Sequence, residues 1–173
     1  MFTIGIVGHR FLANTGAQSF IEQQCTEILL HLQLKHKQIV ALSAIAEGAD
    51  SIFAEAALSL NIPLKIVRPF YNYENDFVSI VAKDCYMRLK SSATQEIILP
   101  YQNRSESAYM AGMQWVVNQS TLLLAAWNGI CEGGKGGTAD AVKHAIYANC
   151  DWVHIDVSNL SAKLFSTTSN HLL

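Results

Sequence analysis

The sequence predicts an α/β protein, a three-layer α/β/α domain built on a mostly parallel sheet of about six strands. Short apolar runs of strand length alternate along the chain with longer segments in which apolar residues recur at helical spacing. Of the 173 residues, 50% are hydrophobic and 15% are charged, as expected when helices cover both faces of a sheet. Regular alternation of strands and helices favours parallel pairing through crossover connections.

The first half of the chain contains three such strand and helix pairs. Strands are expected over residues 3–7, 39–42 and 64–67, and helices over 16–34, over 49–60 and from about residue 74. The first strand ends at Gly8, and Pro63 lies just beyond the second helix, which it cannot continue. Apolar residues repeat along one face of the first helix, which is therefore amphipathic.

The second half continues the alternation. Strands are expected over residues 96–99, 121–126 and 152–155, and helices over 106–118 and 139–148. There is no linker-like stretch and no internal repeat, so residues 3–156 are predicted to form one domain. Residues 157–173 are rich in Ser, Thr and Asn and are expected to be a frayed C-terminal tail.

Composition excludes several classes of partner. The formal net charge of −2 gives no general attraction to nucleic acid or to an anionic membrane, so neither is expected as a partner. The apolar runs are far shorter than the roughly 20 residues that span a bilayer. The four scattered cysteines are expected to be reduced thiols in a cytoplasmic protein without a signal peptide. No metal-ligand spacing and no cofactor motif is present, and the high apolar fraction is compatible with a homo-oligomer.

Ligands of open parallel sheets bind outside the carboxyl ends of the strands, and this sequence concentrates its polar residues and glycines there. We therefore expect a ligand site built from the loops that follow the strands. Its predicted residues are Gly8, His9, Arg10, Glu47, Gly48, Arg68, Trp127, Gly134, Lys135, Gly136, Gly137 and Thr138.

The glycine-rich segment that ends at Thr138 is the strongest single motif. Glycines let backbone N–H groups approach an anion closely, and the following helix adds unpaired amides and a partial positive charge. Lys135 supplies a cation. A tight turn with an ordinary threonine cap is the other interpretation. The segment has neither the GxxxxGK[ST] order nor the GxGxxG order, so the usual NTPase and dinucleotide signatures are missing.

The remaining loop residues each have two interpretations. Arg10 suits bidentate recognition of a phosphate, or it pairs with a nearby acid. His9 faces the same crevice or orders its own loop. Glu47 accepts from a ribose, orients Arg10 or acts as a base, whereas Asp50 suits the first turn of a helix whatever the function. Trp127 borders a base pocket or belongs to the core.

Four loop segments together resemble the SLOG superfamily: residues 6–10 (IVGHR), 46–50 (AEGAD), 126–129 (AWNG) and 134–140 (GKGGTAD). That group includes the LONELY GUY phosphoribohydrolases, the core of DNA-processing protein A and many bacterial nucleotide sensors. The resemblance covers about residues 3–156. It implies a Rossmann-like sheet and a nucleotide or nucleotide-derived ligand at the glycine-rich loop.

The hydrolase branch of that superfamily resembles PGGxGTxxE, and this chain departs from it. Ala141 stands where the motif has its glutamate, Gly133 replaces the proline, and Lys135 replaces a glycine. We therefore expect a nucleotide-binding sensor module. The alternative is an N-glycosidase or phosphoribohydrolase of a nucleoside monophosphate, in which Glu47 or Asp140 is catalytic and orients water while Arg10 anchors the phosphate.

Overall fold

The computed structural model describes residues 1–10, 12, 15–131 and 135–166. Within these ranges one seven-stranded sheet has the order β4-β3-β2-β1-β5-β6-β7. The strands are β1 (Phe2–Gly8), β2 (Ile39–Ser43), β3 (Leu64–Arg68), β4 (Gln95–Ile98), β5 (Leu122–Trp127), β6 (Asp151–Asp156) and β7 (Ser161–Phe165). All neighbouring pairs are parallel except β6 with β7. The predicted α/β class with a mostly parallel sheet is confirmed.

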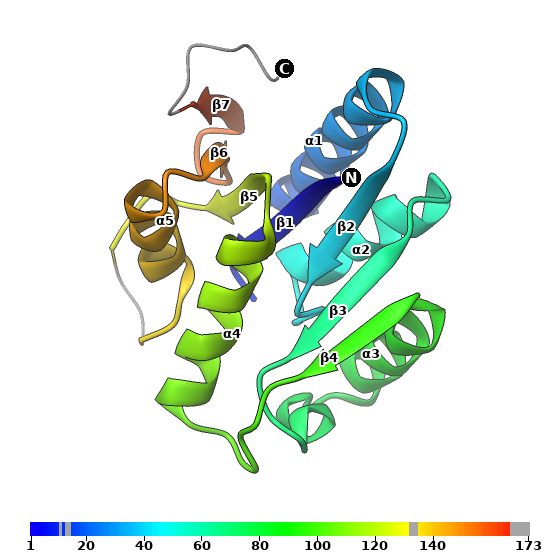
Figure 1. Ribbon diagram of the computed structural model, residues 1–173, viewed down its shortest axis with the longest axis vertical. Helices are drawn as coiled ribbons and strands as arrows, with labels where there is room; N and C mark the ends of the chain where they lie inside the picture. Colours follow the sequence, from blue (N-terminus) through cyan, green and yellow to red (C-terminus); the bar gives the residue numbers. More distant parts are fainter. Residues whose placement is uncertain (11, 13–14, 132–134, 167–173) are drawn as a thin grey trace.

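Helices cover both faces of this sheet (Figure 1). The helices are α1 (Thr15–Lys35), α2 (Ala49–Ser59), α3 (Ile80–Ser92), α4 (Glu106–Gln119) and α5 (Thr138–Tyr147), with a short 3-10 helix, η1 (Tyr73–Asp76). Buried residues of α1, α2 and α3 form one apolar cluster with the sheet, and those of α4 and α5 form a second with its other face. Two apolar layers thus enclose the sheet, and burial of this surface is the main force that holds the fold together.

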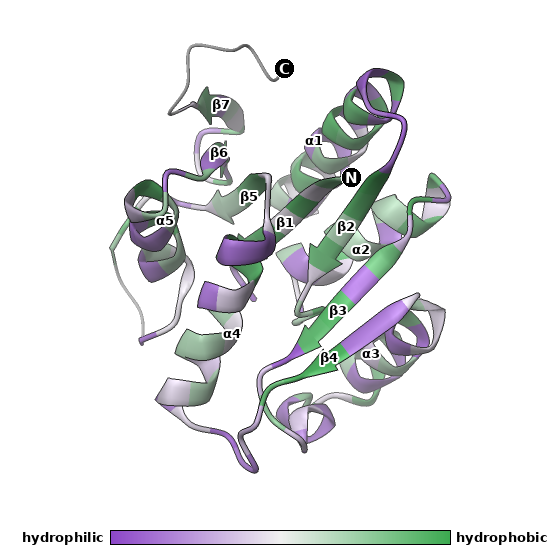
Figure 2. Ribbon diagram, viewed as in Figure 1, coloured by the Kyte–Doolittle hydropathy of each residue, from purple (hydrophilic) through white to green (hydrophobic). Residues whose placement is uncertain are grey.

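Hydropathy follows position in the sheet. Strand β2 is buried at all five positions and is largely green in Figure 2, whereas the outer strand β4 is hydrophilic over its first residues. A strand flanked on both edges and both faces has no contact with water, and β4 has only one neighbouring strand. The charged and amide side chains of β4 therefore lie at the sheet margin.

The sheet reverses its winding direction at β1. From β1 the chain adds β2, β3 and β4 on one side, then crosses back to place β5 on the other side. Gly8, the last residue of β1, lies opposite Ala126 of β5. The carboxyl ends of β1 and β5 therefore diverge into loops at one point, which is where open sheets of this kind bind ligands.

Two features differ from the sequence-based expectations. The third helix begins at Ile80 instead of near residue 74, because the Ser79 hydroxyl caps it by accepting from the Ala82 amide at 3.0 Å. The segment before it forms η1. The C-terminal tail contains β7, whose residues pair with β6 in antiparallel register, with Phe165 opposite Trp152. Their rings stack with centroids 4.4 Å apart, which gives this exposed strand a hydrophobic anchor.

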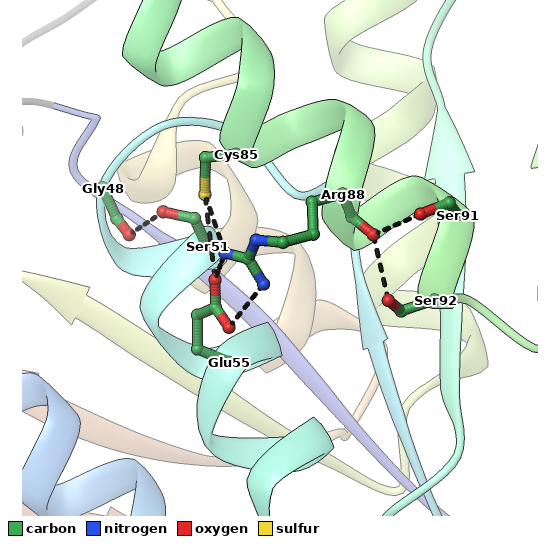
Figure 3. A network of polar contacts seen from close by, with 7 residues as sticks. All are labelled: Gly48, Ser51, Glu55, Cys85, Arg88, Ser91 and Ser92. Carbon is green, nitrogen blue, oxygen red and sulfur yellow. Dashed lines mark hydrogen bonds and ion pairs between the residues drawn. The ribbon is translucent and has the colours of Figure 1, made fainter.

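Polar contacts join α2 to α3 on the surface (Figure 3). The Arg88 guanidinium donates to both carboxylate oxygens of Glu55, with Nη1 3.0 Å from Oε2, and the Cys85 thiol contacts Oε1 at 3.9 Å. Both ion-pair partners are largely exposed, so this network stabilises the fold only modestly. Arg88 is therefore a suitable matched control for substitutions of the arginines in the candidate site.

Gly8 is required where the end of β1 meets α2. A Cβ atom there would lie 2.4 Å from the Ala49 Cβ and 2.8 Å from the Ala126 carbonyl oxygen. Since neither contact involves a flexible side chain, Gly8→Ala is expected to lower the free energy of unfolding by about 1–3 kcal/mol. Urea denaturation measures this. The control is Ser19→Ala on the exposed face of α1, for which the change should stay within about 0.5 kcal/mol. Equal midpoints for the two variants would contradict the prediction.

Candidate functional site

A cavity of about 600 Å³ opens at the carboxyl ends of β1 and β5, between the loops of the switch point. Its volume lies within the range of small-molecule sites. The first loop, after β1, and the last loop, before α5, both line it. The lining residues used below are Gly8, His9, Arg10, Asp50, Tyr73, Arg104, Tyr109, Met113, Val116, Trp127, Lys135, Gly136, Gly137 and Thr138.

Backbone contacts fix the loop after β1. The His9 amide donates to the Ala126 carbonyl at 3.0 Å, and the His9 carbonyl accepts from the Ala49 amide at 3.1 Å. Gly48 has a φ of 90°, and a Cβ atom on it would lie 2.4 Å from the carbonyl oxygens of both His9 and Arg10. Only glycine fits this position, so the loops after β1 and β2 are locked together and Arg10 has a fixed starting point.

The described part of the loop before α5 is held from two sides. The Gly136 amide donates to the Asp140 carboxylate at 3.0 Å. Gly136 has a φ of 81°, and a Cβ atom on it would lie 2.7 Å from the Met110 amide nitrogen of α4. The N-cap of α5 is Gly137, which has no side chain to cap the helix. The first-turn amides of a helix have no intrahelical partners, and those of α5 also lack a capping side chain from Gly137. They lie at the end of the helix where its dipole favours an anion.

Arg10 is anchored by a buried carboxylate. Its Nη1 atom lies 2.8 Å from Oδ2 of Asp76, whose side chain is 3% exposed. The Tyr109 hydroxyl donates to the same oxygen, and the Tyr109 ring centroid lies 5.3 Å from the Arg10 guanidinium carbon. Burial opposes the charge of Arg10, but Tyr73 and Asp76 outweigh it, so the pKa of Arg10 is raised above its ordinary value. Arg10 is thus a permanent cation that keeps 35% of its side-chain surface exposed.

Asp50 is the buried acid of the cavity lining. Its carboxylate oxygen Oδ2 accepts from the Ser43 hydroxyl at 3.2 Å. Burial raises the pKa of Asp50 to about 6, an effect that the Ser43 hydrogen bond and the charge of Arg10 partly offset. Sequence reasoning assigned Asp50 to the first turn of a helix. The apolar residues around it carried no signal that its carboxylate would be enclosed in the cavity wall.

His9 and Trp127 have largely structural surroundings. The His9 Nε2 atom accepts from the Asn128 amide at 3.2 Å, which orders the loop after β5. Trp127 is buried within the α4 and α5 cluster, and its Nε1 atom is enclosed without a hydrogen-bond partner among the described residues. Trp127 therefore gives the cavity an apolar wall with no exposed donor.

Eight of the predicted ligand residues line the cavity, and three do not. The eight are Gly8, His9, Arg10, Trp127, Lys135, Gly136, Gly137 and Thr138. Glu47 is exposed to solvent outside the lining, and Gly48 supports the lining from behind. Gly134 falls outside the described residues.

The third, Arg68, lies outside the cavity lining. Its guanidinium nitrogens lie 3.0 Å from Glu96 and 3.3 Å from Glu74, away from the cavity lining. Arg68 ends β3, two strands away from the switch point. At that position an arginine reaches the acids of β4 and η1, and these contacts satisfy its charge.

Besides Asp50, the lining includes Tyr73, Arg104 and Tyr109, which were not placed there from the sequence. Tyr73 and Arg104 come from segments with no periodic signal, and Tyr109 lies within the helix expected over residues 106–118. Asp76, the anchor of Arg10, likewise lies in an unpredicted 3-10 helix. Its place beside Arg10, 66 positions away in sequence, follows from the fold alone.

Two features are absent from the residues that the structure describes. None of their clusters of His, Cys, Asp and Glu contains the three or more side chains that a metal ion would need. None of their helices is long and apolar enough to cross a membrane.

The fold is of the SLOG type, with a Rossmann-like sheet and a cavity at its switch point. DNA processing protein A from Streptococcus pneumoniae superposes with a TM-score of 0.64 at 16% identity, over 88% of this chain and 50% of that one. The chain thus spans half the length of the pneumococcal protein. No family model and no curated protein sequence matches.

Two further solved structures share the fold. DNA processing protein A from Helicobacter pylori, described for its single-stranded DNA binding mode, has a TM-score of 0.61 at 15% identity, over 91% of this chain and 70% of that one. A molybdenum cofactor binding protein from Rippkaea orientalis has a TM-score of 0.57 at 16% identity, over 88% and 75% of the two chains. At such identities the likeness concerns the fold.

The buried Asp50 predicts a pH dependence of stability. Its pKa is raised on folding, so the stabilising contribution is complete below the unfolded pKa of about 4 and is lost as pH rises through about 6. Asp50→Asn removes this contribution. The free energy of unfolding of the variant relative to wild type should therefore increase by on the order of 3 kcal/mol from about pH 4 to about pH 7. Urea denaturation across this range tests it, and parallel curves for the two proteins would show that Asp50 titrates normally.

Proposed function

We propose that this protein binds a nucleotide or nucleotide-derived phosphate in the switch-point cavity and serves as a sensor module. One observation carries the proposal: Arg10 and the segment Gly136–Thr138, far apart in sequence, line the same cavity. A fixed guanidinium and the amides at a helix N-terminus are the two commonest protein groups that bind phosphate.

The anionic group is assigned to the α5 end of the cavity. The amides of Gly137 and Thr138 and the Thr138 hydroxyl donate to its oxygens, while Arg10 neutralises its charge. Lys135 adds a second cation. Its ammonium group is 3.7 Å from Glu106, but both side chains are more than 70% exposed, so this weak pair leaves Lys135 available to a ligand.

Part of the cavity wall is apolar and suits the base. Met113, Val116 and Trp127 contribute side chains from α4 and β5. Micromolar affinity needs about 8 kcal/mol net, and each charge-assisted hydrogen bond supplies about 1.5–3 kcal/mol before association costs. The phosphate contacts alone fall short of this, so burial of a planar base on the apolar wall is a necessary part of the binding energy.

The similar folds bind ligands of different kinds, since one is named for a molybdenum cofactor and another for single-stranded DNA. For this chain we favour a small ligand. The formal net charge is −2, and the cations that line the cavity converge on one space instead of forming a stripe along the surface.

The positions of the acidic side chains favour binding without turnover over hydrolysis. Neither predicted catalytic acid lines the cavity: Glu47 is exposed, and a carboxylate oxygen of Asp140 accepts from the Gly136 amide. Asp50 does line it, but the Ser43 hydroxyl and nearby backbone amides bond to its carboxylate, which holds the loop after β2. A general acid or base needs free access to the substrate.

The binding proposal is tested by calorimetric titration with AMP, GMP, CMP and UMP. At least one should bind saturably, and Arg10→Ala should weaken it by about 10-fold to 100-fold, because one charge-assisted contact is lost. The matched control is Arg88→Ala, which removes an exposed guanidinium outside the cavity. It should leave the affinity unchanged.

Removal of Arg10 leaves the buried Asp76 with one cation fewer, so the fold is checked by the thermal midpoint of each variant. Arg10→Lys keeps the charge and loses the planar fork, and its affinity should fall between those of wild type and Arg10→Ala. A short oligothymidylate should bind no more tightly than UMP. If all four nucleotides fail to bind, or if Arg10→Ala binds as wild type does, the proposal is wrong.

A separate experiment addresses the glycosidase alternative. Incubation with the same four monophosphates should release no free base, as followed by chromatography, because no unengaged acid borders the cavity among the described residues. Release of base that is abolished by Glu47→Gln or by Asp140→Asn would establish the hydrolase instead.

A further inference from the structure

A second arginine stands beside Arg10 at the cavity, and the proposed function has not yet used it. Arg104 lies just before the Ser105 cap of α4 and lines the cavity with 71% of its side chain exposed. Its Nε atom is 3.5 Å from Oδ1 of Asp76, and its guanidinium carbon is 5.8 Å from the Tyr109 ring centroid. Arg10 and Arg104 thus share one carboxylate and one aromatic ring.

This cluster of two arginines, Asp76 and Tyr109 has an excess of positive charge. Asp76 is a single buried carboxylate, and the Tyr109 hydroxyl already donates to the oxygen that Arg10 contacts. Within this cluster one carboxylate therefore faces two guanidinium groups. Each guanidinium has five N–H donors and uses few of them on Asp76, so most remain available to a ligand.

The arginine pair adjoins the phosphate loop. Gly136 packs so closely on the start of α4 that a Cβ atom there would lie 2.9 Å from the Tyr109 carbonyl carbon. The Tyr109 ring in turn contacts Arg10 and Arg104. The Gly136 segment and the two arginines therefore all lie against Tyr109, and together they give the cavity more donors for anions than one phosphate requires.

We propose that the ligand of this cavity carries a diphosphate, as in a nucleoside diphosphate. This inference rests on the proposed function. One phosphate binds the Gly137 and Thr138 amides with Arg10, and the next binds between Arg10 and Arg104. Asp76 and Tyr109 act as positioning residues that hold the two guanidinium groups side by side.

A role for Arg104 only as a counter-ion of Asp76 explains its position less well than a role in ligand binding does. Arg10 and Tyr109 already satisfy one oxygen of that carboxylate at hydrogen-bond distance, whereas Arg104 reaches the other oxygen only at 3.5 Å and from a mostly exposed position. Such an exposed pair is weak. Arg104 contributes little to the stability of the fold and lies at the mouth of the cavity, so its guanidinium is available to bind a ligand.

Calorimetric titration compares each monophosphate with its diphosphate, AMP with ADP and likewise for G, C and U, without added divalent cation. For the base that binds, wild type should favour the diphosphate by about tenfold or more. Arg104→Ala should remove this preference by weakening the diphosphate about tenfold while it leaves the monophosphate within about threefold. Arg88→Ala should change neither, and Arg104→Lys should retain part of the preference.

The outcomes separate this inference from the proposed function. Saturable monophosphate binding with no diphosphate preference would overturn the inference and leave the proposed function intact. The inference also fails if Arg104→Ala weakens both ligands equally, because Arg104 would then only shape the first phosphate site. If neither class of nucleotide binds, both proposals are wrong.

Discussion

The ion pair between Arg10 and the buried Asp76 is the contact on which the candidate site depends. It joins the loop after β1 to η1 and, through Tyr109 and Arg104, to the start of α4. Without Asp76, the Arg10 side chain at the end of β1 would extend into solvent with no fixed orientation. Truncation of one partner of a buried pair leaves an uncompensated charge, so loss of either side chain would destabilise this end of the sheet.

The second half of the site consists of backbone groups, so no flexible side chain has to be ordered there. Gly8 and Gly48 let three backbone segments approach one another, so the first loop is locked against α2. Gly136 does the same for the last loop against α4. The carboxyl ends of β1 and β5 thereby face one cavity with backbone donors in place. Preorganised donors of this kind lose little entropy when a ligand binds.

Much of this arrangement could be predicted from the sequence, and the rest depended on tertiary contacts. Apolar runs and helical periodicity revealed the parallel sheet, and the rule for carboxyl ends selected the loops that hold Arg10 and Thr138. Arg68 satisfied the same rule, but its strand lies toward the sheet edge, where acids take up its charge. Asp76 and β7 were missed because a single turn of 3-10 helix and a polar edge strand leave no periodic apolar pattern.

The central claim is that the amides at the start of α5 and the guanidinium of Arg10 bind one anionic group. Nuclear magnetic resonance of the 15N-labelled protein tests it directly during titration with a nucleotide that binds. Saturable shifts should appear at the amides of Gly136, Gly137 and Thr138 and at the Arg10 side chain, with the Arg68 side chain unchanged. The claim is contradicted if the resonances of these groups stay unchanged and the shifts occur at Arg68 or elsewhere on the surface.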